Sequence, residues 1–145
     1  MTSVPRNRLL IILGAAIALT TAAELFYLVV WGLWLFPAGS LLGKIAWTLT
    51  CGVAMGAVIG ASTLLWVEGR YRGRAAFART ALVMAAVGSY CAWLCSRIDH
   101  YLNYFGGAEN GTLFLLAGVI PAIFGGGLYA WLLYGRHAPF EQGAL

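Results

Sequence analysis

Charged side chains are scarce in this sequence. They make up 10% of the 145 residues, whereas hydrophobic residues make up 61%. A soluble domain of this size carries about 25% charged residues, so the shortage excludes an ordinary soluble domain. Four long apolar runs account for the difference, at about 9–36, 45–67, 80–98 and 112–134. We therefore predict an all-α integral membrane protein that forms a single four-span domain over residues 1–145.

Motifs for several kinds of chemistry are also missing. The sequence contains no Gly-rich phosphate loop, no Ser-His-Asp set and no HExxH pattern. No second membrane histidine faces His100, which argues against a haem held by two histidines from different spans. The three cysteines are an odd number and lack zinc-finger spacing. The residues therefore assign no cofactor.

Acidic residues number five against nine Lys and Arg, which gives a net charge of +4. The basic residues gather at the ends of the apolar runs, so lipid headgroups rather than nucleic acid are their predicted partner. Seven of the nine lie before the first run, in the loop 68–79 or after the fourth run, where Arg136 and His137 stand at the membrane edge. The positive-inside rule then predicts a plasma or inner membrane protein with both termini cytoplasmic and the loop 99–111 outside. Short loops predict an up-down-up-down bundle of four transmembrane helices.

The first apolar run begins after Arg6 and Arg8, as a signal peptide would. It continues to Phe36, however, and ends only at Pro37, which cannot extend a helix. This length exceeds an ordinary signal-peptide core and suffices for a hydrocarbon layer of about 30 Å. We predict an uncleaved first span.

Glu24 is the one acidic residue in the middle of this span. An ionised carboxylate is costly at that depth, so Glu24 is predicted to face protein or water. Thr20 and Thr21 lie one turn away on the same side, and Tyr90 and a helix break at Pro121 are predicted at similar depth. Three roles remain open for Glu24: a proton-exchanging transport site, a polar contact to a neighbouring helix, or a contact to another subunit.

Small residues recur at four-residue spacing in every span. The most regular stripe is Gly52, Gly56 and Gly60 in the second span, a pattern typical of close helix packing. Four helices alone need not use every stripe internally. We therefore predict a homo-oligomer or a complex with other membrane subunits.

Two weaker constellations contain potential metal ligands or thiols. Cys91 and Cys95 share one helix face, and Cys51 lies at a depth similar to Cys91, so Cys51 and Cys91 are the pair expected to meet. Simple packing is the plainest explanation, and a disulfide, thiol chemistry or soft-metal binding would also fit them. In the outer loop, Asp99 and His100 have side chains that bind cations, although a solvated loop explains them equally well.

Three functions follow, in order of preference. The first is proton- or cation-linked transport of a small solute that uses Glu24, with Tyr90 and the Pro121 break completing the site. The second is a non-catalytic subunit or assembly factor of a larger membrane complex. The third is a membrane enzyme with thiol or metal chemistry at the cysteines.

Overall fold

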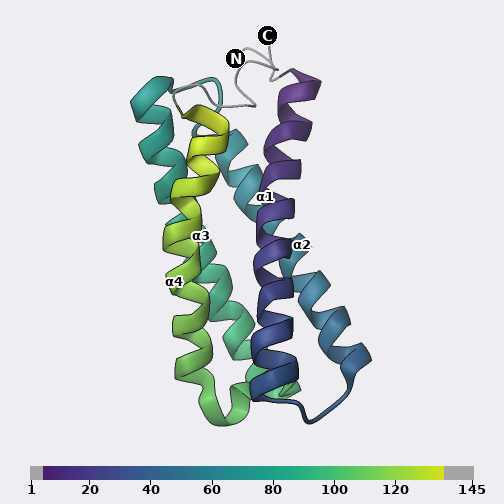
Figure 1. Ribbon diagram of the computed structural model, residues 1–145. Coiled ribbons are helices and arrows are strands. Elements are labelled where there is room, and N and C mark those ends of the chain that lie inside the picture. The colour runs from purple at the N-terminus through teal and green to yellow at the C-terminus, as the bar shows by residue number, and fades with distance from the viewer. Residues whose placement is uncertain (1–4, 136–145) are drawn as a thin grey trace.

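The computed structural model describes residues 5–135, apart from the side chain of Phe114. The tail residues Arg136 and His137 lie outside the described residues. The chain forms a bundle of long helices that run alternately in opposite directions (Figure 1). The elements are α1 (Arg6–Tyr27), a π-helix η1 (Leu28–Leu35) that continues α1, α2 (Leu41–Trp66), α3 (Gly73–Leu102) and α4 (Gly107–Tyr134).

Within residues 5–135, four helical segments are long and apolar enough to cross a membrane, which confirms the all-helical class. The helices extend past the predicted apolar runs at several ends, and α2, for example, begins at Leu41 rather than near residue 45. Ser40 begins α2, and its hydroxyl oxygen accepts a hydrogen bond from the Gly43 N–H at 3.1 Å. The first span ends differently: the backbone changes from α-helix to π-helix at Leu28 and finishes as η1. The sequence analysis had not anticipated this change of helix type.

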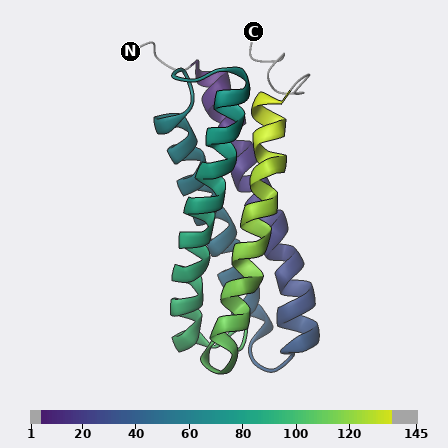
Figure 2. The ribbon, with the colours of Figure 1, turned by 90° about the vertical axis from the view of Figure 1, so that its left-hand side faces the viewer.

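Two antiparallel hairpins make up the bundle. In the first, α2 packs closely on α1, with Gly52 against Thr21, Gly56 against Ile17, and Gly60 against Leu13. In the second, Gly88 lies against Ala122, Gly118 against Ala92, and Gly126 against the Ala81 backbone. Figure 2 shows α3 and α4 side by side along their length. The stripe of α2 is therefore used inside the chain, and α3 and α4 pack through small residues of both helices: Ala81, Gly88 and Ala92 of α3, and Gly118, Ala122 and Gly126 of α4.

In the first hairpin, Gly56 is the glycine with the least room for a side chain. A Cβ there would lie 2.8 Å from the Ile17 backbone nitrogen and 2.5 Å from the Thr20 hydroxyl oxygen. We expect Gly56→Ala to lower the free energy of unfolding by about 1–3 kcal/mol, the usual cost of overpacking. Gly14→Ala is the matched control, because nothing lies within 4 Å of its Cβ position. Unfolding by SDS in mixed micelles measures both, and equal losses would contradict this packing.

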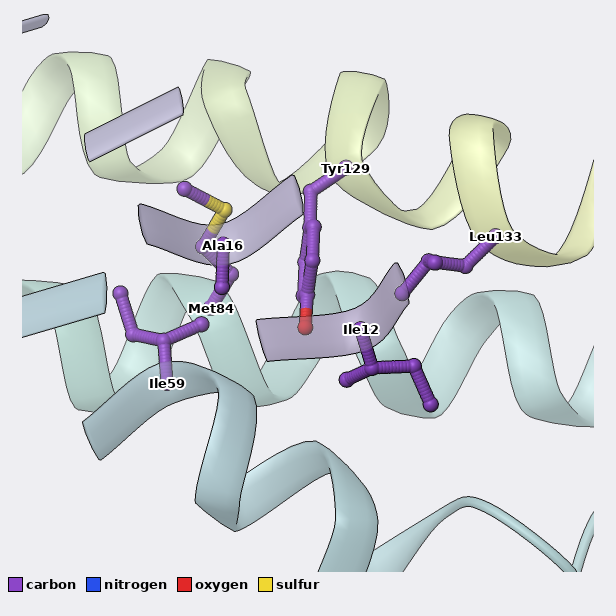
Figure 3. Close-up of a cluster of buried hydrophobic side chains, with 6 residues drawn as sticks. All are labelled: Ile12, Ala16, Ile59, Met84, Tyr129 and Leu133. Atoms are coloured by element: carbon purple, nitrogen blue, oxygen red, sulfur yellow. The ribbon is translucent and has the colours of Figure 1, made fainter. Parts of the chain in front are cut away.

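The hairpins meet around one buried apolar cluster, shown in Figure 3. Every helix contributes to it; its members are Ile12, Ala16, Ile59, Met84, Tyr129 and Leu133. The Tyr129 hydroxyl donates a hydrogen bond to the Thr63 hydroxyl at 2.9 Å, so its polar end is satisfied although the side chain is fully buried. This cluster fills the bundle towards the end at which α1 begins and α4 finishes.

Candidate functional site

A pocket of about 420 Å³ lies next to the apolar cluster, between the two hairpins. All four helices line it, and Ile59 and Met84 belong to both the pocket and the cluster. Its walls are almost entirely apolar. Among the described residues around it, none is Lys, Arg or His, and Glu24 is the one acidic residue.

Glu24 is the one ionisable carboxyl group among the described residues that line this pocket. Within the described part of the chain, its carboxyl has no hydrogen-bond or ion-pair partner. A smaller hollow of about 20 Å³ continues from it and is lined by Glu24, Tyr27, Ala92, Cys95 and Gly118. Glu24 was predicted to face protein or water, and in the structure it lines this pocket between the helices.

Only some of the residues predicted to accompany Glu24 line the pocket. Thr20 lines it, but its hydroxyl donates towards the backbone carbonyl oxygens of Ala16 at 2.9 Å and Gly52 at 2.6 Å. Thr21 instead packs on Gly52, and its buried hydroxyl has no partner among the described residues. Thr20 therefore joins α1 to α2, and neither threonine hydroxyl is directed to Glu24 by a hydrogen bond.

Tyr90 does not reach the pocket. The residues of α3 that line it are Met84, Gly88 and Ala92, which follow one another at four-residue spacing on a single helix face. Tyr90 lies halfway between two of them in sequence and so points to the opposite face, where it is 62% exposed and its ring lies 5.9 Å from that of Trp93. The phenol near Glu24 is that of Tyr27, which lines the pocket from α1. Tyr27 follows Glu24 by three residues, and this spacing places both side chains on one helix face, so the sequence could have indicated the pair.

Pro121 lines the pocket but does not break the helix. Helix α4 continues through it to Tyr134, and the non-helical backbone inside α4 is at Asn110, with φ −125° and ψ 35°. The predicted interruption at Pro121 is therefore wrong, and the kink lies near the start of α4. The irregular segment beside Glu24 is η1, which begins one residue after Tyr27. Short π-helical segments often occur at functional sites.

The cysteine pair differs from the expected one. Cys95 and Cys51 place their sulfur atoms 3.4 Å apart, whereas Cys91 is buried separately, and all three are free thiols. The equal-depth argument for Cys51 and Cys91 failed because α2 and α3 present Cys95, one turn further along, to the contact. Across the described residues, no three His, Cys, Asp or Glu side chains gather as a metal site.

Asp99 is a structural cap rather than an outer-loop cation ligand. It is fully buried, and its carboxylate oxygens accept hydrogen bonds from the backbone N–H groups of Tyr104, Phe105 and Gly107 at 2.9–3.3 Å. His100 points elsewhere, with its ring 5.3 Å from that of Tyr101. The two side chains therefore do not form a joint site.

Lys44 lies directly before the predicted second run, and the sequence analysis assigned it no role. Lys44 is 1% exposed, and its ammonium donates hydrogen bonds to the carbonyl oxygens of Gly32, at 2.5 Å, and of Phe36. These carbonyls lie at the end of the first span, where helical partners run out. Trp31 donates from its indole nitrogen to the Phe105 carbonyl oxygen at 2.7 Å. Together these contacts close the bundle at the α3–α4 loop end.

A second polar network closes the opposite end. The Arg8 guanidinium donates to the Glu68 carboxylate at 3.0 Å and to the Leu133 carbonyl oxygen at 3.2 Å. The Tyr134 hydroxyl also donates to the Glu68 carboxylate. Glu68 lies in the loop between α2 and α3, as expected, and its carboxylate also connects α1 to the end of α4.

The pocket is thus an apolar chamber with one acidic group, closed by packed residues towards both ends of the bundle. Such an arrangement can hold an apolar molecule and place a charge or a proton beside it. It offers neither a nucleophile with a paired base nor a phosphate-binding loop among the residues that line it. Comparison with protein-family models, with curated proteins and with solved structures finds no match to this chain.

Proposed function

We propose that this protein moves a small solute across a membrane in a cycle linked to protons or another cation, with Glu24 as the exchanging group. The observation that carries the proposal is the 420 Å³ apolar pocket between the two hairpins, in which Glu24 is the one acid. A carboxyl in such a place binds either a proton or a cation, and that exclusive choice is what couples two fluxes.

The arrangement of the helices supports the same proposal. The pocket lies between two tightly packed hairpins whose contacts with each other are looser, so the hairpins are the units that would move to expose Glu24 alternately. The positive-inside rule orients the termini and the Arg-rich loop 68–79 towards the cytoplasm of a plasma or inner membrane. In that orientation the Lys44 and Asp99 contacts close the outer end.

Proton movement in proteoliposomes tests the proposal. With a pH dye inside the vesicles, we expect Na⁺, K⁺ or a small organic amine added outside to drive proton movement in the wild type. Glu24→Gln should fold and abolish that movement, because an amide cannot exchange a proton. Glu109→Gln makes the same chemical change on an exposed residue and should leave it intact. Proton movement that is unaltered by Glu24→Gln, or absent for every probe in the wild type, would refute the proposal.

The alternative function, a subunit or assembly factor, has one observation in its favour. The first-span stripe of Gly14, Ala18 and Ala22 is exposed, and nothing lies within 4 Å of the Cβ position of Gly14. The Gly56 face is occupied by α1 and is therefore not available to a partner. An assembly role would therefore use the Gly14 stripe. It predicts that Gly14→Leu removes partners from a gentle-detergent extract, whereas a transporter acting through Glu24 would keep its proton movement.

A further inference from the structure

We propose that the pocket binds a lipid-soluble organic cation of charge +1, which enters sideways from the bilayer between α1 and α4. This inference rests on the proposed function and names the class of solute. It follows from three properties of the pocket: the apolar walls, the single unpaired acid, and the side on which the pocket opens.

The walls select an apolar body. A pocket of 420 Å³ has the size of ordinary small-molecule sites, which are mostly lined by apolar and aromatic groups. Met55 and Met84 contribute flexible thioethers that adapt to irregular shapes. Two hydroxyl side chains line the pocket, Thr20 and Tyr27, and that of Thr20 is already used in hydrogen bonds to backbone carbonyls. A sugar or an amino acid would therefore lose its hydration here without finding enough polar partners.

Glu24 selects the charge. An ionised carboxylate in this apolar chamber lacks a cationic side chain among the described lining residues, so a bound ligand has to supply the positive charge. One acid balances one positive charge, which disfavours dications and anions. The aromatic residues Tyr27 and Phe124 also line the pocket, and aromatic rings favour a cation with a delocalised or alkylated charge.

The entry route follows from what blocks the other directions. The buried cluster around Tyr129 fills the bundle on one side of the pocket, and the buried Phe105 and Lys44 fill the end on the other side. The helices α1 and α4 touch each other far less than the partners within each hairpin do. Phe124 lines the pocket and is also 77% exposed, so the pocket reaches the surface of the bundle at α4. In a membrane, that surface faces lipid.

Tetraphenylphosphonium and tetraphenylborate provide a direct test, because they have the same shape and opposite charge. Each radiolabelled ion is titrated onto the full chain in phosphatidylcholine nanodiscs, with empty nanodiscs subtracted. We expect saturable binding of the cation and none of the anion. Glu24→Gln should weaken cation binding by at least about tenfold, since it removes the opposing charge in an apolar site. Glu109→Gln should not change it. Equal binding of the two ions, or a cation affinity unaltered by Glu24→Gln, would overturn the inference.

A second pair of variants keeps the test decisive if Glu24→Gln does not fold. Gly125 lines the pocket, and a Cβ there meets only the flexible end of Met84, at 3.5 Å. Gly125→Leu should therefore fill the pocket and remove cation binding. Gly127→Leu is the matched control, because nothing lies within 4 Å of its Cβ position and it does not line the pocket. Equal binding to these two variants would contradict the assigned pocket.

The two proposals fail in different ways. Cation binding with the expected variant pattern, but without Glu24-dependent proton movement, would uphold the ligand class and refute the transport function. Glu24-dependent proton movement driven by Na⁺ or K⁺, without binding of tetraphenylphosphonium, would uphold transport and refute the ligand class.

Discussion

Arg8→Met is expected to lower the free energy of unfolding by about 3–5 kcal/mol, because it leaves a charge in a protected place without its counterion. The side chains of Arg8 and Glu68 are only 6% and 16% exposed, and their charged groups lie 3.0 Å apart. The same guanidinium also donates to the Leu133 carbonyl oxygen. The substitution therefore removes contacts that α1 makes with two other segments at once. SDS-induced unfolding in mixed micelles measures the loss.

A double-mutant cycle separates the pair from the rest of the network. Glu68→Gln removes the acid, and Arg8→Met with Glu68→Gln removes both charges, so the double variant should recover part of the stability lost in Arg8→Met. Arg6→Met is the control for removing a basic residue near the N-terminus, because Arg6 is exposed. It should cost less than about 0.5 kcal/mol. Similar losses for Arg6→Met and Arg8→Met, or additive effects of Arg8→Met and Glu68→Gln, would show that the pair is not coupled.

The helical class could be predicted because hydrocarbon-length apolar runs leave the backbone few alternatives to a helix. The helix ends were less predictable, since a helix can continue through polar residues beyond its apolar run, as α2 does from Leu41 after the Ser40 cap. The change to a π-helix at Leu28 has no comparable signal in the sequence. Two residues of this segment make contacts far along the chain or in the next helix: the Gly32 carbonyl oxygen accepts from Lys44, and Trp31 donates to the Phe105 carbonyl oxygen.

Part of the site could be predicted from the cost of burying a charge. That cost singled out Glu24, and the pocket contains it together with Thr20 and Pro121. Tyr90 was chosen by depth alone, without regard to its helix face, and depth does not distinguish a residue that faces the pocket from one that faces outwards. The four-residue series through Gly88 identifies the inward face of α3, but only once the packing of α4 on Gly88 is known.

Buried charges at the bundle ends escaped prediction for another reason. Charged residues beside apolar runs usually lie at the membrane interface, so Lys44 and Asp99 had an ordinary explanation. Their side chains are in fact satisfied by backbone groups: carbonyl oxygens for Lys44 and N–H groups for Asp99. A sequence shows that such backbone groups exist but not where the chain turns to bring them together.

Oxidation with diamide is expected to join Cys51 to Cys95 and to leave Cys91 free. Their sulfur atoms lie 3.4 Å apart, so little movement separates the thiols from a bond. In the reaction the two thiols lose two protons and two electrons, and the diazene of diamide takes up both to become a hydrazine. Labelling of the SDS-denatured protein with a maleimide polymer should therefore add three tags before oxidation and one after it.

Single alanine variants decide which cysteines take part. Cys91→Ala should still form the crosslink and retain no free thiol, whereas Cys95→Ala should retain two free thiols after the same treatment. The reverse result would restore the pairing of Cys51 with Cys91. Because the crosslink ties α2 to α3, it joins the two hairpins beside the pocket. If alternating exposure of Glu24 requires the hairpins to separate there, proton movement should stop on oxidation and return on reduction, while Cys95→Ala remains active throughout.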